Sequence, residues 1–247
     1  SKELPAPAPT AVEAPALPPA PDVPEPPPAG TTFTDITAWG QLDIAGPGLG
    51  CSFIDLDNDG WDDVLIPGHG RLHVMKNAGL GYFYEADTVE HADDGGFAYT
   101  LDLTGDGLDD VIYTTGQPTT GGRGRMDSVG DRALKSLGDG RLELIEWAVP
   151  PTAPDAIGSV VTFGDLERRG SLNVLLGAMG DLSSPTLPNG KPERGAADRL
   201  LSRRGPVLLD ITAAAGLLAA DRTQAAMVAD LTGDGQLDLL VGTAGGA

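Results

Sequence analysis

Aspartate residues recur at alternate positions in three short loops of the sequence, at residues 55–63, 102–110 and 230–238. Alternate side chains of such a loop converge on one point, and carboxylate and carbonyl oxygens are the ligands that Ca²⁺ prefers. We therefore predict a Ca²⁺ site in each loop, with position 7 contributing its carbonyl oxygen. The predicted ligands, at positions 1, 3, 5, 7 and 9, are Asp55, Asp57, Asp59, Trp61 and Asp63; Asp102, Thr104, Asp106, Leu108 and Asp110; and Asp230, Thr232, Asp234, Gln236 and Asp238.

An EF-hand loop begins with the same spacing but needs a carboxylate at position 12. Ile66, Tyr113 and Val241 occupy that position here. Short runs of Val, Leu and Ile, typical of strands and too short for helices, flank each loop. These two observations exclude the EF-hand interpretation.

A degenerate copy of the same loop lies at residues 165–173. The four loops are numbered first to fourth along the chain, and this copy is the third. Its positions 5 and 9 are Arg169 and Asn173, which predicts no metal and an ion pair of Arg169 with Asp165 or Glu167. In the second and fourth loops Thr replaces the carboxylate at position 3. Counting carboxylates therefore predicts weaker binding there than in the first loop.

The spacing of the loops predicts the architecture. Their first aspartates are separated by 47, 63 and 65 residues, and each loop joins two apolar stretches. A repeating unit of roughly 60 residues with four strands is typical of a β-propeller blade. We predict an all-β fold, a β-propeller of four-stranded blades, of which residues 31–247 supply three to four. The clearest predicted strands are Asp63–Pro67, Arg71–Lys76, Tyr82–Glu85, Asp110–Thr114, Arg141–Glu146, Asn173–Leu176 and Asp238–Val241.

Two similar segments, Phe33–Thr37 and Leu208–Thr212, each precede a loop by 18 to 20 residues. We predict both to be last strands of a preceding blade. Residues 1–30 contain eleven prolines and no aromatic residue, so they form an extended linker, with a docking strap as the alternative.

The composition excludes several classes of protein. A formal net charge of −20 disfavours nucleic acid, because phosphate binding depends on Lys and Arg. A single cysteine, Cys51, forms no internal disulfide, and its position before the first loop predicts a small core residue. No apolar run is long enough to span a bilayer.

The Asp-x-Asp-x-Asp-Gly-x-x-Asp loop and the strands that follow it resemble the FG-GAP/VCBS repeats of integrin α-subunit propellers. The segments beginning at Phe33, Phe53 and Asn77 make the sequence more similar still to bacterial secreted VCBS proteins and the cartilage acidic protein group. This resemblance implies a seven-bladed propeller, Ca²⁺ in the loops, and a secreted, periplasmic or cell-surface location. It also implies adhesion, or protein or glycan binding, without catalysis.

The preferred function is a calcium-stabilised binding, adhesion or scaffold module. Contacts with protein or glycan partners are expected from the insertions at residues 117–131 and 180–198, and from the proline-rich segment. The alternatives are a structural subunit of a bacterial envelope assembly and the non-catalytic part of a larger secreted enzyme. No catalytic motif is present, and His69 and His73 flank a glycine turn, so we predict no enzymatic activity. Trp39, Trp61 and Trp147 are expected to be buried between blades, with exposed anchors of a binding surface as the alternative.

Overall fold

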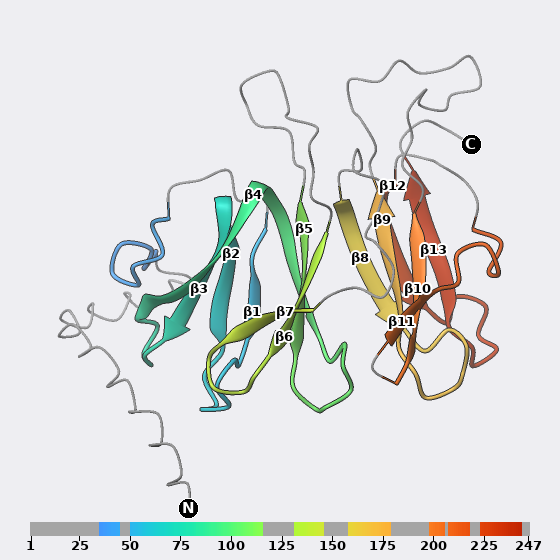
Figure 1. The fold of residues 1–247 in the computed structure, drawn as a ribbon, viewed down its shortest axis with the longest axis horizontal. Coiled ribbons are helices and arrows are strands. Elements are labelled where there is room, and N and C mark those ends of the chain that lie inside the picture. The colour runs from blue at the N-terminus through green and yellow to red at the C-terminus, as the bar shows by residue number, and fades with distance from the viewer. Residues whose placement is uncertain are drawn as a thin grey trace, which may run out of the picture.

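The computed structural model describes residues 35–44, 50–115, 131–145, 158–178, 198–205, 207–217 and 223–243, which form thirteen strands and no helix (Figure 1). The proline-rich segment 1–30 and nearly all of both insertions lie outside these residues. The predicted all-β class is confirmed. The strands are β1 (Ser52–Ile54), β2 (Asp63–Pro67), β3 (His69–Asn77), β4 (Phe83–Leu101), β5 (Asp110–Thr115), β6 (Arg132–Ser136), β7 (Leu142–Ile145), β8 (Gly158–Gly164), β9 (Asn173–Ala178), β10 (Arg199–Arg204), β11 (Val207–Asp210), β12 (Thr223–Ala229) and β13 (Asp238–Thr243).

All neighbouring strands pair antiparallel and follow chain order within each sheet. Blade 1 consists of β1, β2, β3 and the first part of β4. Blade 2 begins with the last part of the same strand β4 and continues with β5, β6 and β7. Blade 3 is β8 to β11, and blade 4 is represented by β12 and β13. The described residues therefore form three four-stranded blades of a partial β-propeller and two strands of a fourth, as predicted.

The repeat is preserved in the pairing of the strands. In each blade the residue before the loop lies opposite the ninth residue of the loop, which fixes the register of the first two strands. All four loops consequently leave their sheets at the same edge of the molecule, the lower edge in Figure 1. The four pairs are Ile54 with Asp63, Leu101 with Asp110, Gly164 with Asn173, and Ala229 with Asp238.

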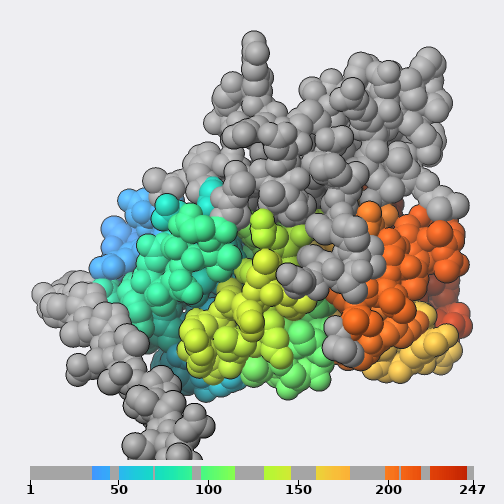
Figure 2. Space-filling view, viewed as in Figure 1, coloured from blue at the N-terminus to red at the C-terminus, as the bar shows by residue number. Residues whose placement is uncertain are grey.

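Apolar side chains on alternate faces of each sheet bind the blades together. In β5, Val111 and Tyr113 pack in a core with blade 1, whereas Ile112 packs in a second core with blade 3. Successive residues of a strand point to opposite faces, so one strand supplies both cores. In the space-filling view, blades 1, 2 and 3 follow one another across the molecule (Figure 2). The first core also contains Leu65, Leu72, Val74 and Leu134, and the second also contains Leu101, Val174, Leu176 and Leu201.

Blades 3 and 4 approach each other closely. A Cβ atom added to Gly164 would lie 2.7 Å from Cγ1 of Val228, and one added to Gly177 would lie 2.9 Å from Cγ2 of Thr223. The buried carboxylate of Asp198 adds a polar connection, since it accepts hydrogen bonds from Ala178 N at 2.9 Å and Thr223 Oγ1 at 2.7 Å. Gly164 and Gly177 thus allow blade 4 to approach blade 3, and the Asp198 carboxylate links the two blades.

The prediction of last strands at Phe33–Thr37 and Leu208–Thr212 is half right. Strand β11 confirms the second segment as the last strand of blade 3. The described part of the first segment, residues 35–37, is not a strand but enters a turn at residues 37–41. Asp35 caps that turn by accepting a hydrogen bond from Thr37 N, and Asp210 does the same for Thr212 N. The likeness between the two segments therefore marks equivalent capped turns.

Candidate metal centres in the blade loops

The aspartate at position 1 holds each loop in shape. Asp55 accepts hydrogen bonds from Asp59 N at 3.1 Å and Gly60 N at 3.0 Å, and Asp102 accepts them from Gly105, Asp106 and Gly107. The glycine at position 6 adopts a positive φ, +87° at Gly60, which side chains disfavour. The loop is thus folded by its own backbone amides.

The carboxylate at position 9 joins the loop to the third strand of its blade. Asp63 accepts hydrogen bonds from Asn77 N at 2.8 Å and Leu56 N at 3.3 Å. Asp110 accepts hydrogen bonds from Ser136 N at 3.0 Å, the equivalent of Asn77 N, and from Thr104 N, at position 3 of the loop, at 2.8 Å. Both side chains are fully buried, and this burial raises the pKa of each carboxyl above its ordinary value. The predicted ligands Asp63 and Asp110 therefore also hold their loops against the third strand of the blade.

The first loop brings Asp55, Asp57 and Asp59 together: one carboxylate oxygen from each lies within 4.8 Å of the others. Oxygens bound to one Ca²⁺ at roughly 2.4 Å can lie at most about 4.8 Å apart, so the donor set fits this ion. The set contains only oxygen, which matches a hard cation.

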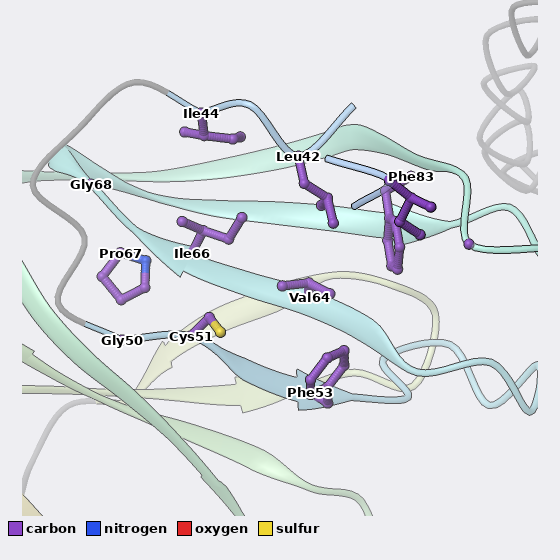
Figure 3. Close-up of a pocket in the computed structure, with 12 residues that line it drawn as sticks. Leu42, Ile44, Gly50, Cys51, Phe53, Val64, Ile66, Pro67, Gly68 and Phe83 are labelled. Atoms are coloured by element: carbon purple, nitrogen blue, oxygen red, sulfur yellow. The ribbon is translucent and has the colours of Figure 1, made fainter. Parts of the chain in front are cut away.

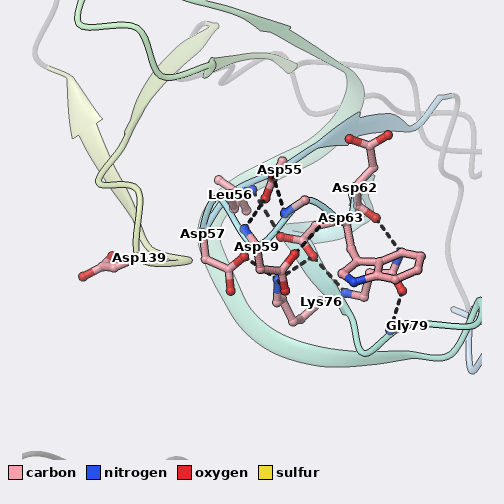
Figure 4. A network of polar contacts seen from close by, with 12 residues as sticks. Asp55, Leu56, Asp57, Asp59, Asp62, Asp63, Lys76, Gly79 and Asp139 are labelled. Atoms are coloured by element: carbon pink, nitrogen blue, oxygen red, sulfur yellow. Dashed lines mark hydrogen bonds and ion pairs between the residues drawn. The ribbon is translucent and has the colours of Figure 1, made fainter.

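A lysine enters the same loop from β3 (Figure 4). Lys76 Nζ lies 2.5 Å from Asp57 Oδ1, 2.9 Å from Asp59 Oδ2 and 3.3 Å from Asp63 Oδ1, and its side chain is only 12% exposed. Burial alone would lower the pKa of Lys76, but its hydrogen bonds to Asp57 and Asp59 raise it well above the usual range. Its hydrogen bond lowers the pKa of Asp59. The loop therefore holds a side-chain cation among its predicted ligands.

In the second loop, Lys135 occupies the equivalent position on β6, but among the described residues it makes one ion pair, 2.8 Å to Asp106 Oδ2. Its side chain is 37% exposed. This contact lowers the pKa of Asp106. The Thr104 hydroxyl lies beside the carboxylates of Asp106 and Asp110. The lysine of the second loop thus contacts one carboxylate, whereas the lysine of the first loop contacts three.

The third loop has a full set of protein partners. Arg204 Nη2 lies 2.7 and 2.9 Å from the two oxygens of Glu167, which also accepts hydrogen bonds from Ser202 and Asn173. These contacts lower the pKa of Glu167 from 4.5 to about 2, with Arg204 as the largest cause. The predicted pair of Arg169 with Glu167 is confirmed at 3.7 Å, but Arg204, which the sequence analysis did not identify, is the closer partner.

The fourth loop is exposed. Asp230 accepts hydrogen bonds from Gly233, Asp234 and Gly235, and Asp238 accepts them from Leu231 N and Thr232 N. Within the part of the chain that the structure describes, no ion pair involves this loop. Its geometry repeats that of the second loop without a lysine.

The residues at position 7 support the loops through their backbone amides. Trp61, Leu108 and Gln236 each donate an N–H to the aspartate at position 5, at 2.8, 3.0 and 2.8 Å. The expectation that Trp61 is buried between blades is wrong, because its side chain is 52% exposed beside the first loop. Trp39 is half-buried and packs edge-on against Tyr82. Trp147 lies outside the described residues.

An apolar groove of 720 Å³ lies on the face of blade 1 that points away from blade 2. Leu42 and Ile44 lie across it from Cys51 and Phe53, with β2 between them (Figure 3). The expectation that Cys51 is a core residue is wrong, because Cys51 is exposed, and Phe53 is 60% exposed. The lining of the groove is mostly apolar and includes the Cys51 thiol.

Comparison with known proteins identifies one part of the chain. The structure is similar to that of an Agrocybe aegerita lectin, described for specific recognition of non-reducing terminal N-acetylglucosamine, with 15% identity and a TM-score of 0.37 over 77% of this chain and 46% of the lectin. This chain therefore spans less than half the length of that lectin. No curated protein matches the sequence. Residues 55–113 match the model of the FG-GAP-like repeat family, so this span, from the first loop to β5, is an FG-GAP-like repeat.

Proposed function

We propose that this protein is a calcium-stabilised, non-catalytic binding module that acts outside the cytoplasm and contacts protein or glycan partners. The observation that carries the proposal is the convergence of Asp55, Asp57 and Asp59 in the first loop, in a scaffold that recurs in the second and fourth loops. The FG-GAP-like repeat supports a binding role on a propeller frame.

The proposed role of Ca²⁺ is to stabilise the loops. Millimolar Ca²⁺ at a site with a Kd of about 10⁻⁴ to 10⁻³ M contributes roughly 0.4 to 1.4 kcal/mol. Such sites would be empty at cytosolic Ca²⁺, which supports an extracellular or periplasmic location. The described residues include no helix of the length and apolar character needed to cross a membrane.

The proposed role assigns His73, one of the two histidines considered for catalysis, to the sheet of blade 1, where it pairs with Glu85 at 2.5 Å. The groove on blade 1 supports a binding surface, because its lining is almost entirely apolar.

Isothermal titration calorimetry of the metal-free protein with Ca²⁺ tests the proposal. We expect binding with Kd near 10⁻⁴ to 10⁻³ M and a rise in the midpoint of thermal unfolding. Asp106→Asn and Asp234→Asn should each remove binding at one loop. Asp109→Asn is the matched control, since Asp109 is an exposed residue at position 8 of the second loop, outside the predicted ligands. The proposal is wrong if Ca²⁺ at 10 mM neither binds nor raises the midpoint.

A further inference from the structure

The ammonium group of Lys76 lies where the carboxylates of the first loop converge. It is within 3.3 Å of three aspartates, two of which, Asp57 and Asp59, are also close to Asp55. Asp57 is the carboxylate that the second and fourth loops lack. The first loop therefore combines the largest number of carboxylates with the most enclosed side-chain cation of the described loops.

We propose that Lys76 is an internal cation that occupies the first loop without metal and leaves it when Ca²⁺ binds, so that the first loop binds Ca²⁺ more weakly than the second and fourth. This inference rests on the proposed function and concerns the regulation of its sites. The order is the reverse of the one that the carboxylate count predicts.

Electrostatics requires Lys76 to move. Like charges a few ångströms apart repel strongly, so a divalent ion and the ammonium cannot share the same oxygens. The position to which Lys76 can move is visible in the structure. A cavity of 360 Å³ beside the first loop is lined by Lys76, by Asp87, and by Asp139 with its ion-pair partner Arg141, so that Asp87 is the acidic residue there that has no cationic partner among the described residues. The flexible stem of lysine allows its ammonium group to turn into such a space without a change in the backbone.

Comparison of the loops separates this role from that of an ordinary surface ion pair. Lys135, at the equivalent position of blade 2, has one carboxylate partner and is three times as exposed as Lys76, 37% against 12%. In blade 3 the equivalent residue is Ser202, and Arg204 binds Glu167 instead. The competition should therefore be strong in the first loop and weak in the second.

Terbium luminescence excited through tryptophan can report on the first loop alone. Trp61 is at position 7 of that loop, where the second and fourth loops have Leu108 and Gln236. Trp61→Phe identifies the part of the signal that comes from this loop. Displacement of Tb³⁺ by Ca²⁺ then gives the Ca²⁺ affinity of the first loop in each variant.

We expect Lys76→Gln to raise the Ca²⁺ affinity of the first loop about tenfold or more, corresponding to about 1.4 kcal/mol. Lys76→Arg should keep the wild-type affinity within about threefold, because it retains the cation. Lys135→Gln is the matched control and should leave the Trp61 signal unchanged. If Lys76→Gln unfolds without metal, the Ca²⁺ concentration that restores its fold measures the same affinity.

Failure of this inference differs from failure of the proposed function. If calorimetry shows Ca²⁺ bound to the wild type, but Lys76→Gln binds it no more tightly at the first loop, Lys76 is not a competitor and the proposed function stands. If the wild-type first loop binds more tightly than the second and fourth, the inference is also overturned. If no variant binds Ca²⁺ at any loop, both are wrong. Binding at the first loop of Lys76→Gln that is absent from the wild type supports the inference.

Discussion

Thr223 Oγ1 donates a hydrogen bond of 2.7 Å to Asp198 Oδ2, and both residues are buried where blade 3 meets blade 4. The other oxygen of Asp198 accepts a bond from Ala178 N, so one carboxylate serves both blades. This contact does not involve the aspartate loops.

Asp198→Ala should lower the free energy of unfolding by about 2–3 kcal/mol, because it leaves the Ala178 amide and the Thr223 hydroxyl without this acceptor. Urea denaturation measures the loss, and hydrogen exchange should show faster exchange in β12. Asp109→Ala, at an exposed position, controls for the loss of an aspartate. Equal stability of the two variants would show that the carboxylate does not couple the blades.

The contact of Glu167 with Arg204 should make stability depend on pH. The pKa of Glu167 is lowered in the folded protein from 4.5 to about 2, so the unfolded chain takes up a proton first as the pH falls. The contribution is complete above about pH 4.5 and is lost as the pH falls towards 2. We expect Glu167→Gln to cost about 1 kcal/mol at pH 7 and progressively less towards pH 3. Denaturation at pH 7, 5 and 3 tests this, with Glu143→Gln as the exposed control, and a pH-independent difference would contradict it.

Gly177 should not accept a side chain. A Cβ there would lie 2.5 Å from Cγ1 of Val160 and 2.9 Å from Cγ2 of Thr223, so Gly177→Ala should destabilise the protein by about 1–3 kcal/mol. Gly242 is the equivalent residue of blade 4, and its nearest neighbours would lie 3.6 Å away. Gly242→Ala should therefore change stability by at most about 0.5 kcal/mol. The midpoints of thermal unfolding compare the two, and equal effects would show that the close contacts of Gly177 with Val160 and Thr223 do not limit the size of this residue.

Cys51 should react in the native protein. Its side chain is exposed beside the groove, so Ellman's reagent at pH 8 should modify one thiol per chain without denaturant. A reaction that requires urea would show that another part of the protein covers this face. Phe163→Ser, at an exposed residue far from the groove in sequence, should leave the rate unchanged.

The sequence predicted most of what is encoded locally. The bounds of β2 agree with the predicted strand Asp63–Pro67, because the loop that precedes it fixes where pairing begins. Lys76 and Arg204 were missed as partners of the loops, since they lie on the third strand of their blades and only the pairing of strands brings them near. The sequence did contain a sign of the lysine contacts. Lys76 directly precedes Asn77, and Lys135 directly precedes Ser136, and the amides of Asn77 and Ser136 donate hydrogen bonds to the aspartates at position 9, Asp63 and Asp110.

The predictions that Cys51 and Trp61 are buried failed because neither side chain is covered by a neighbouring blade in the described residues. Cys51 and Phe53 have the apolar character of core residues, but no described blade covers their side of blade 1. Trp61 is large and apolar, yet its position in the loop is set by the hydrogen bond of its amide to Asp59 and not by its ring. For the groove residues and for Trp61, the position of the residue in the blade determines how exposed its side chain is, and its hydrophobicity does not.

Strand β4 runs for 19 residues from the outer side of blade 1 to the first position of blade 2. No loop separates these two units, so neither can be excised by cutting a connection between them. Removing blade 1 would cut β4 within a continuous strand, and a force applied along β4 would load both sheets at once. Although the loops repeat blade by blade, we therefore expect blades 1 and 2 to unfold together as a pair.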